Sequence, residues 1–200
     1  LTADEVRARF DSPVVRTGFR VTHAATVQPG RLARGLRNAL LERGVRIFEG
    51  TPVERLNARR PAAETASGTV RAGRAIVGMN AWARAMRDFR RSLVVRGTYI
   101  VISAPAPERL EAMHWTGGEG VYDMRTSLHY LRPTRDGRIA FGGSSFRVIR
   151  DRADSPRYGY DEASASVLAR DFRRWLPAFD GVPLEAAWGG PIDVAGLHTP

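Results

Sequence analysis

The second half of the chain contains strand-like segments that follow one another through turns rather than through helices. These segments are 94–103, 120–124, 128–132 and 138–142. Between the last two, Thr134-Arg-Asp136-Gly137 contains an Asp-Gly pair, which supplies the positive φ that a tight hairpin turn requires. Strands joined in this way form antiparallel sheets. The pattern therefore predicts an antiparallel sheet from about residue 93 onward.

A helix and a final strand follow this predicted sheet. Asp161 is placed to cap a helix that carries Phe172 and Trp175 on its apolar side, and Pro177 stops it. The segment 184–188 then has strand character, and Gly189-Gly190 is expected to begin a loop.

The first half alternates predicted helices and strands. Pro29 opens a helix, because its missing N–H costs nothing in the first turn, and Gly44 ends that helix as a C-terminal cap. Leu32, Leu36 and Leu40 form one apolar stripe along it. Further helices are predicted over 1–11, where Thr2 is the cap, and over 81–90. Strands are predicted over 18–27, 45–49, 51–56, 69–72 and 75–79, with a loop over 59–66.

The formal net charge is +10, and all 31 basic residues are arginine. A protein that binds nucleic acid gathers such charges on one face, with aromatic residues between them. Here the arginines are spread along the chain and mixed with 21 acidic residues. Arginine without lysine is more typical of a GC-rich genome. A non-catalytic Arg-rich module that binds nucleic acid or another anionic partner remains the alternative interpretation.

Cysteine is absent, which excludes disulfides, thiolate metal sites and cysteine nucleophiles within these residues. The longest apolar runs are far too short to cross a bilayer, and no secretory leader is visible. A cytoplasmic protein that does not interact with membranes is therefore expected. The first residue is not Met, which we interpret as a start inside a longer protein.

Four motifs occur in a specific order along the chain. The first motif begins at Val27-Gln-Pro29, continues to Arg43-Gly44-Val45 and is followed by the segment 51–56. The second is the segment 70–82, which ends in Met79-Asn80-Ala81-Trp82. The third is the segment 130–143, which contains the Asp-Gly hairpin, and the fourth is Trp188-Gly-Gly-Pro-Ile-Asp193. Their order resembles that of the D-amino-acid oxidase and glycine oxidase (DAO) superfamily of FAD-dependent oxidoreductases. The fourth motif is most similar to the γ-glutamylputrescine-oxidase-like amine oxidases.

This resemblance implies an α+β chain with two parts. Residues 28–92 and 183–200 would belong to a partial FAD-binding α/β domain. Residues 10–27 and 93–182 would form a substrate-binding antiparallel sheet with helices. Such enzymes begin with a G-x-G-x-x-G turn that binds the FAD pyrophosphate, and no such turn occurs here. We therefore expect an internal fragment that is inactive alone and binds FAD weakly or not at all.

The resemblance also implies a reaction. A small-molecule amine or amino acid transfers a hydride from the carbon bearing nitrogen to the flavin, and water hydrolyses the resulting imine. Dioxygen or another acceptor then takes the electrons. Sequence alone does not separate these two acceptors.

Site residues follow from the same resemblance. The residues expected to contact the cofactor are Val53, Met79, Asn80, Ala81, Trp82 and Gly190, and those expected to contact the substrate are Tyr122, Tyr130 and Trp188. No catalytic residue is assigned and no metal is expected. Several of these site residues also have a purely structural interpretation, because valine is often a core residue and tryptophan or tyrosine often packs against a sheet. His129, one of four scattered histidines, is interpreted as structural or exposed.

One departure from the family bears on the substrate. Relatives that oxidise α-amino acids often place an arginine shortly after Trp-x-Gly, where it binds the substrate carboxylate. Pro191-Ile192-Asp193 stands there in this chain, and no arginine follows Arg174. This favours an amine, or a substrate whose carboxylate lies far from the reacting carbon. Asp193 is either an attractor for an ammonium group or a solvated loop residue.

Overall fold

The computed structural model describes residues 1–57, 59–126, 128–144 and 153–195. Its contacts divide the chain into two units. One unit consists of Leu1–Thr26 and Asn80–Pro200, and the other of Val27–Met79. Each unit has a sheet of its own. Among the described residues, no helix combines the length and the apolar character that crossing a membrane requires.

The smaller unit, Val27–Met79, contains one helix and a small sheet. Helix α2 (Pro29–Glu42) begins after Gln28, whose side chain accepts a hydrogen bond from the N–H of Arg31, and ends before Gly44 with its φ of 78°. Both predicted ends are thus confirmed. The antiparallel sheet has the order β1 (Arg55–Asn57), β2 (Ala62–Thr65) and β3 (Gly68–Arg71).

Several strand predictions for this unit are wrong. Residues 45–49 and 75–79 form no strand, and 51–56 contributes only its last two residues, to β1. Residues 62–65, predicted as part of a loop, form the central strand β2. An apolar run becomes a strand only where a neighbouring strand accepts its hydrogen bonds. Ile76, in the most apolar run, is 98% exposed instead of covered on both faces.

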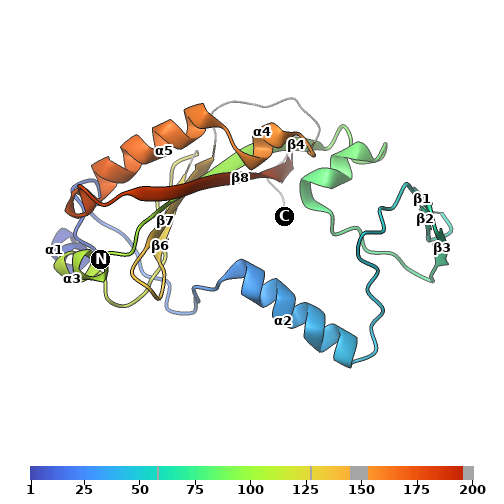
Figure 1. The fold of residues 1–200 in the computed structure, drawn as a ribbon, viewed down its shortest axis with the longest axis horizontal. Helices are drawn as coiled ribbons and strands as arrows, with labels where there is room; N and C mark the ends of the chain where they lie inside the picture. The colour runs from blue at the N-terminus through green and yellow to red at the C-terminus, as the bar shows by residue number, and fades with distance from the viewer. Residues whose placement is uncertain (58, 127, 145–152, 196–200) are drawn as a thin grey trace. The chain divides into compact units, whose positions relative to one another are not determined.

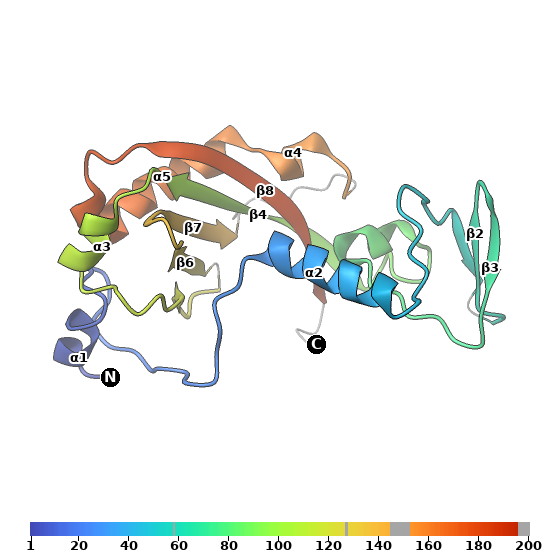
Figure 2. The ribbon, with the colours of Figure 1, turned by 60° about the horizontal axis from the view of Figure 1, so that its bottom comes forward.

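The larger unit contains the predicted antiparallel sheet, which has five strands in the order β5-β6-β7-β4-β8. The strands are β4 (Leu93–Ser103), β5 (Val121–Tyr122), β6 (His129–Pro133), β7 (Ile139–Ser144) and β8 (Leu184–Ala195). Every neighbouring pair is antiparallel. Figure 2 shows β4 and β8 as two long strands side by side. The predicted α+β class is therefore observed.

The hairpin between β6 and β7 forms where the Asp-Gly pair predicts it. The N–H of Thr134 donates to the carbonyl of Arg138, and Gly137 has a φ of 79°. Asp136 accepts hydrogen bonds from Thr134 and Arg138, and these bonds lower the pKa of its carboxyl. The turn sets the register in which Tyr130 lies opposite Gly142.

Strand β8 is longer than predicted, and this corrects the expected loop at Gly189-Gly190. Both glycines lie inside the strand, opposite Tyr99 and Thr98 of β4. The Tyr99 ring covers Gly189, and its hydroxyl donates to the carbonyl of Arg157. Glycine is needed here because a side chain would occupy the space of the ring. The assignment of 183–200 to an FAD-binding domain remains a prediction, although β8 shares its sheet with β4.

Helix α5 (Glu162–Trp175) lies over one face of this sheet (Figure 1), and the buried core residues lie between them. The helix begins at Asp161, whose side chain caps its first turn as predicted. Edge-to-face contacts join Phe141 of β7 to Phe172 and Trp175, with ring centroids 5.8 and 6.0 Å apart. These buried rings fix α5 on the sheet.

Shorter elements complete the larger unit. Helix α1 (Ala3–Arg7) has the predicted cap at Thr2, with Glu5 closing a capping box. The segment 18–27, predicted as a strand, has no regular structure, and the predicted helix 81–90 is only the short 3-10 helix η1 (Asn80–Ala85) followed by turns. The remaining elements are α3 (Pro107–Ala112), α4 (Pro156–Gly159) and η2 (Pro177–Phe179).

Candidate active site

The central strand β4 separates two faces of the sheet. Its odd-numbered residues from Val95 to Ser103 are buried, and its even-numbered residues from Arg96 to Ile102 are partly exposed. Successive strand residues point to opposite faces, and directly paired residues share a face. We call the buried face the helix side. The open face is the one formed by the even-numbered β4 residues and their direct partners.

One row of residues crosses all five strands on the open face. Its members, paired strand by strand, are Tyr122, Tyr130, Gly142, Ile100 and Trp188. The structure thus places the three residues predicted to contact the substrate in one row, in which Tyr122 and Tyr130 are neighbours and Trp188 lies at the opposite edge of the sheet, about 19 Å from Tyr122. Tyr122 is 53% exposed and Trp188 41% exposed, so both present aromatic surface to solvent. We call this set the aromatic row.

Tyr130 lies flat along the row. A Cβ on Gly142 would clash with the Tyr130 ring and would lie 2.7 Å from its hydroxyl oxygen, which means that the ring occupies the space above the glycine. The hydroxyl oxygen is 2.9 Å from Oγ1 of Thr98. Burial raises the pKa of the Tyr130 hydroxyl, and the hydrogen bond with Thr98 offsets part of that rise. The side chain is therefore a fixed, neutral hydroxyl at neutral pH.

Replacing Gly142 with alanine is expected to lift the Tyr130 ring off the sheet. The new methyl group occupies the ring's place, so unfolding in urea should require about 1–2 kcal/mol less free energy than for the unaltered protein. Ultraviolet titration should then find a tyrosine that ionises at lower pH, because exposure removes the cause of its raised pKa. Tyr130→Phe, which keeps the ring and loses only the hydroxyl, is the control. Unchanged stability and titration in Gly142→Ala would contradict this geometry.

Gly190 lies on the open face one position beyond the aromatic row. It pairs with Thr98, and a Cβ placed on it would have no atom within 4 Å. Unlike Gly189, therefore, it is not needed for packing within the described residues. Space of this kind allows a ligand to approach the backbone closely.

The predicted cofactor residues Asn80, Ala81 and Trp82 lie at the edge of the same sheet. Asn80 has a φ of 48°, and its side-chain oxygen accepts hydrogen bonds from the N–H of Ala81 and, at 3.2 Å, from the N–H of Asp193. Because β8 is an edge strand, this second bond fastens η1 to it. Ala81 is fully buried and Trp82 is 47% exposed. Asp193 is a residue of β8 and not of a loop.

The other two predicted cofactor residues belong to the smaller unit. Val53 precedes β1 and is 39% exposed, and Met79 ends the unit and is partly buried. They are thus in a different unit from the open face, and their contact with a cofactor remains a prediction.

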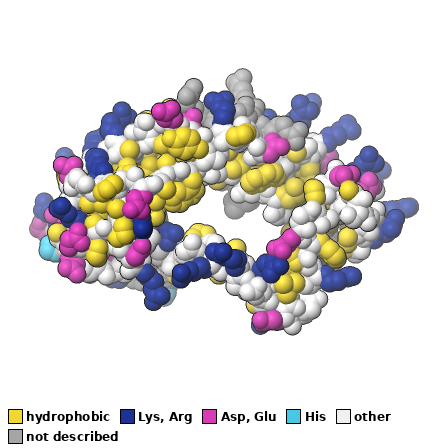
Figure 3. All heavy atoms as spheres, in the orientation of Figure 1, with side chains coloured by type: hydrophobic (Ala, Val, Ile, Leu, Met, Phe, Trp, Pro, Cys, Tyr) yellow, Lys and Arg dark blue, Asp and Glu magenta, His cyan; other side chains and the backbone are white. Residues whose placement is uncertain are grey.

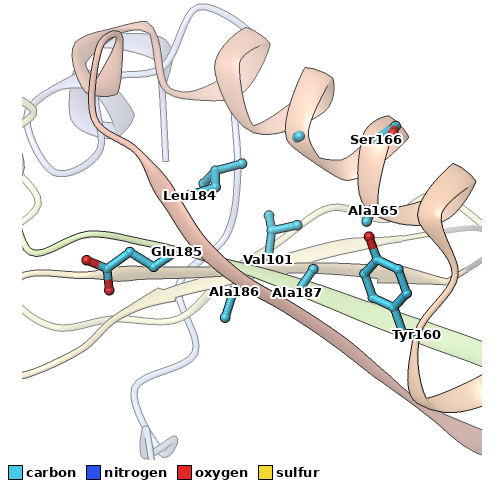
Figure 4. Close-up of a pocket in the computed structure, with 9 residues that line it drawn as sticks. Val101, Tyr160, Ala165, Ser166, Leu184, Glu185, Ala186 and Ala187 are labelled. Atoms are coloured by element: carbon cyan, nitrogen blue, oxygen red, sulfur yellow. The ribbon is translucent and has the colours of Figure 1, made fainter.

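A shallow cavity of about 350 Å³ lies elsewhere, between α5 and β8 (Figure 4). Its lining is mainly alanine, valine and leucine, with Tyr160, Ser166 and Glu185 as the polar members. None of the predicted site residues lines it. Within the described residues there is also no group of three His, Cys, Asp or Glu side chains that could hold a metal ion. We therefore take the open face as the candidate site.

Sequence reasoning missed several residues of the open face. Arg96, Thr98 and Ile100 alternate with buried residues along β4, and the sequence shows this period of two at the polar residues Arg96 and Thr98 but not at Ile100. The Asp-Gly hairpin likewise fixed Gly142 opposite Tyr130 once its turn was recognised. The pairing of β4 with β8 had no such local signal.

Known proteins resemble this chain along nearly all of its length. A family model described as FAD dependent oxidoreductase (DAO) matches residues 1–199. The probable oxidoreductase OrdL of Rhizobium meliloti is 29% identical over 204 residues, covering 98% of the chain and 44% of that protein. The gamma-glutamylputrescine oxidoreductase of Escherichia coli is 26% identical over 178 residues, covering 87% of the chain and 40% of that protein. The chain thus spans less than half the length of these relatives.

Solved structures share the fold. Glycine oxidase from Geobacillus kaustophilus superposes with a TM-score of 0.64 at 20% identity, over 84% of this chain and 43% of its own. L-proline dehydrogenase from P. horikoshii gives a TM-score of 0.65 at 18% identity, over 84% of this chain and 44% of its own.

Proposed function

Because the chain belongs to the DAO family of FAD-dependent oxidoreductases, we propose that the whole protein oxidises a C–N bond of an amine or amino acid. The substrate carbon gives up a hydride, and water hydrolyses the imine that forms. The observation that carries this proposal is the aromatic row, which lies on a partly exposed face of a sheet in a chain of this family. The substrate is proposed to bind on that face.

The open face suits a flat ring system. It presents aromatic and aliphatic surface at Tyr122, Ile100 and Trp188, and its backbone is accessible at Gly190. The cofactor of the family is FAD, which accepts the hydride when bound. We propose that Gly190 and the segment 80–82 face its ring system. The chain contains no G-x-G-x-x-G turn for the pyrophosphate, so these residues would supply only part of the FAD site.

The residues of this chain have distinct proposed roles. Tyr122 packs against the substrate beside Tyr130, and Trp188 shields the row from water at the opposite edge of the sheet. Tyr130, held by Thr98, offers a neutral hydroxyl in a fixed position, which orients a polar group of the substrate. Such positioning is the main contribution that a protein makes when a cofactor performs the chemistry.

The finer specificity is also a proposal. Pro191, Ile192 and Asp193 follow the Trp-Gly-Gly sequence, so the carboxylate-binding arginine of α-amino-acid oxidases has no counterpart there. This supports an amine, or a substrate with a remote carboxylate. We propose that dioxygen or another oxidant accepts the electrons. We also propose that the protein is located in the cytoplasm.

The alternative of a nucleic-acid-binding module has no comparable support. Basic and acidic side chains are interspersed on the face drawn in Figure 3. Some arginines are neutralised by ion pairs, such as Arg37 with Glu49 at 2.7 Å. The relatives from Rhizobium meliloti and Escherichia coli are oxidoreductases by their descriptions.

Anaerobic mixing of the FAD-loaded whole protein with candidate substrates tests the proposed function. Primary and secondary amines should bleach the flavin absorbance, and they should do so faster than glycine or D-alanine. Faster bleaching by the two amino acids would overturn the preference for amines. No bleaching by any amine or amino acid would overturn the function itself.

A further inference from the structure

Arg96 stands out among the residues of the open face. It is an even-numbered residue of β4, pairs with Ile192 of β8, and lies two residues from Thr98. Its Nε atom is buried and has no hydrogen-bond partner among the described residues. It is the one side-chain nitrogen or oxygen in the described part of the chain with this property.

An unpaired buried N–H on a permanent charge is costly. Guanidinium stays protonated at all ordinary pH values, and a buried donor left without an acceptor costs about 1–3 kcal/mol or more. Elsewhere in the described residues, Arg138 is paired with Asp136 and Arg173 donates to two carbonyl groups. Arg96 Nε thus retains hydrogen-bonding capacity that the described residues do not use.

The charge of the open face points to the kind of ligand. Within the described strand residues, this face carries two arginines, Arg96 and Arg132, and no aspartate or glutamate. The described neighbours of Arg96 on the face are Val94 and Ile192, which are apolar, and Thr98, whose hydroxyl is hydrogen-bonded to Tyr130. A planar guanidinium with no carboxylate among these neighbours matches a carboxylate of a ligand, which it binds through two parallel hydrogen bonds.

The position of Arg96 limits where that carboxylate lies. Arg96 and Ile100 are four residues apart on β4, so at about 3.3 Å per residue their backbones are about 13 Å apart. Thr98 and Gly190 lie between them on the open face. A ligand that reaches from the aromatic row to the Arg96 side chain must therefore be several bonds long.

We propose that Arg96 binds a carboxylate of the substrate that is remote from the C–N bond to be oxidised. This proposal rests on the proposed amine or amino-acid oxidation. In this proposal Arg96 of β4 binds the substrate carboxylate, a role for which no arginine is present after Trp188. The substrate class is accordingly an elongated amine with a terminal carboxylate, rather than an α-amino acid.

Substrate pairs test the proposal on the FAD-loaded whole protein. Each pair consists of a straight-chain ω-amino acid and the alkylamine of the same chain length. Arg96→Met should raise KM for the ω-amino acid at least about tenfold, the effect of losing one charged hydrogen-bonded pair, with little change for the alkylamine. Arg96→Lys keeps the positive charge but loses the planar pair of N–H donors, so its effect should be smaller.

A control comes from outside the open face. Arg135→Met removes an exposed arginine of the turn between β6 and β7 and should leave both KM values unchanged. Equal effects of Arg96→Met on both members of a pair, or no effect on either, would overturn the proposal. If another part of the protein binds the carboxylate, Arg96→Met should change neither KM.

Equilibrium binding separates this proposal from the proposed function. Calorimetric titration with a straight-chain monocarboxylate needs no turnover. Binding that Arg96→Met abolishes would support the site even if no amine is oxidised. Amine oxidation combined with carboxylate binding that does not depend on Arg96 would refute the site and leave the function intact. Thermal unfolding should find Arg96→Met no less stable than the unaltered protein, because an unpaired buried donor is removed.

Discussion

Replacing His129 with leucine is expected to lower the free energy of unfolding by about 2–3 kcal/mol, because it leaves partly buried carboxylate oxygens without a hydrogen-bond partner. His129 is 6% exposed, and its two ring nitrogens lie 3.1 Å from Asp123 Oδ2 and 3.2 Å from Asp171 Oδ2. Leucine removes the side-chain contacts with Asp171 and Asp123, although Asp123 keeps the hydrogen bond from the backbone N–H of residue 129 and its ion pair with Arg125. Urea titration of the whole protein, followed by circular dichroism, measures the loss.

Two further variants make the result interpretable. His129→Gln keeps a similar size and one N–H donor, so its loss should be smaller than that of the leucine variant. His23→Leu replaces an exposed histidine, and its stability should change by no more than about 0.5 kcal/mol. If His129→Leu were as stable as the unaltered protein, the bridge between Asp123 and Asp171 would contribute nothing.

Gly189→Ala should produce the second large loss. A Cβ at this position would clash with the Tyr99 ring and would lie 2.6 Å from the backbone oxygen of Tyr158. Backbone atoms cannot move aside cheaply, so the clash has to be relieved by displacing α4 or the tyrosine. We expect the free energy of unfolding to fall by about 3 kcal/mol, the upper end of the usual cost of overpacking. Thermal and urea unfolding both measure it.

The adjacent glycine provides the control. Gly190→Ala adds the same methyl group where no atom lies within 4 Å, so stability should change by no more than about 0.5 kcal/mol. The same variant should weaken binding of FAD or substrate to the whole protein, since Gly190 is proposed to face them. Equal destabilisation by the two alanines would contradict the packing described for Gly189. Undiminished FAD and substrate binding by Gly190→Ala would contradict its proposed role.

Local signals predicted the fold best where they specify backbone conformation. Pro29 and Gly44 marked both ends of α2, Asp161 marked the start of α5, and Asp136-Gly137 marked the hairpin. Each of these residues acts within a few positions of itself. Its effect can therefore be read without knowing what packs against it.

Predictions failed where the outcome depends on distant partners. The extension of β8 through Gly189 depends on the Tyr99 ring, some ninety positions earlier in the chain. For His129 the sequence left a structural and an exposed role open, because its burial depends on Asp171, which belongs to α5. Apolar residues 75–79 were predicted as a strand from composition alone, and composition does not supply a pairing partner.

The candidate site depends partly on local signals and partly on distant partners. Tyr130 and Gly142 lie opposite each other because of the β6–β7 turn, which the Asp-Gly pair predicts. Trp188 joins them only through the pairing of β8 with β4, which no local pattern specifies. The three residues predicted to contact the substrate came from family resemblance, and the structure adds that they lie in one row.

The two tyrosines that cover glycines have a consequence for how this sequence can vary. Tyr99 and Gly189 on one face, and Tyr130 and Gly142 on the other, each form a pair in which a ring fills the place of a missing side chain. At Gly142 a larger residue becomes tolerable only after the Tyr130 ring has been lost, whereas at Gly189 the backbone oxygen of Tyr158 excludes a side chain even without the Tyr99 ring. As related genes diverge, substitution in the second pair is therefore expected to begin with the tyrosine, and Gly189 is expected to be retained.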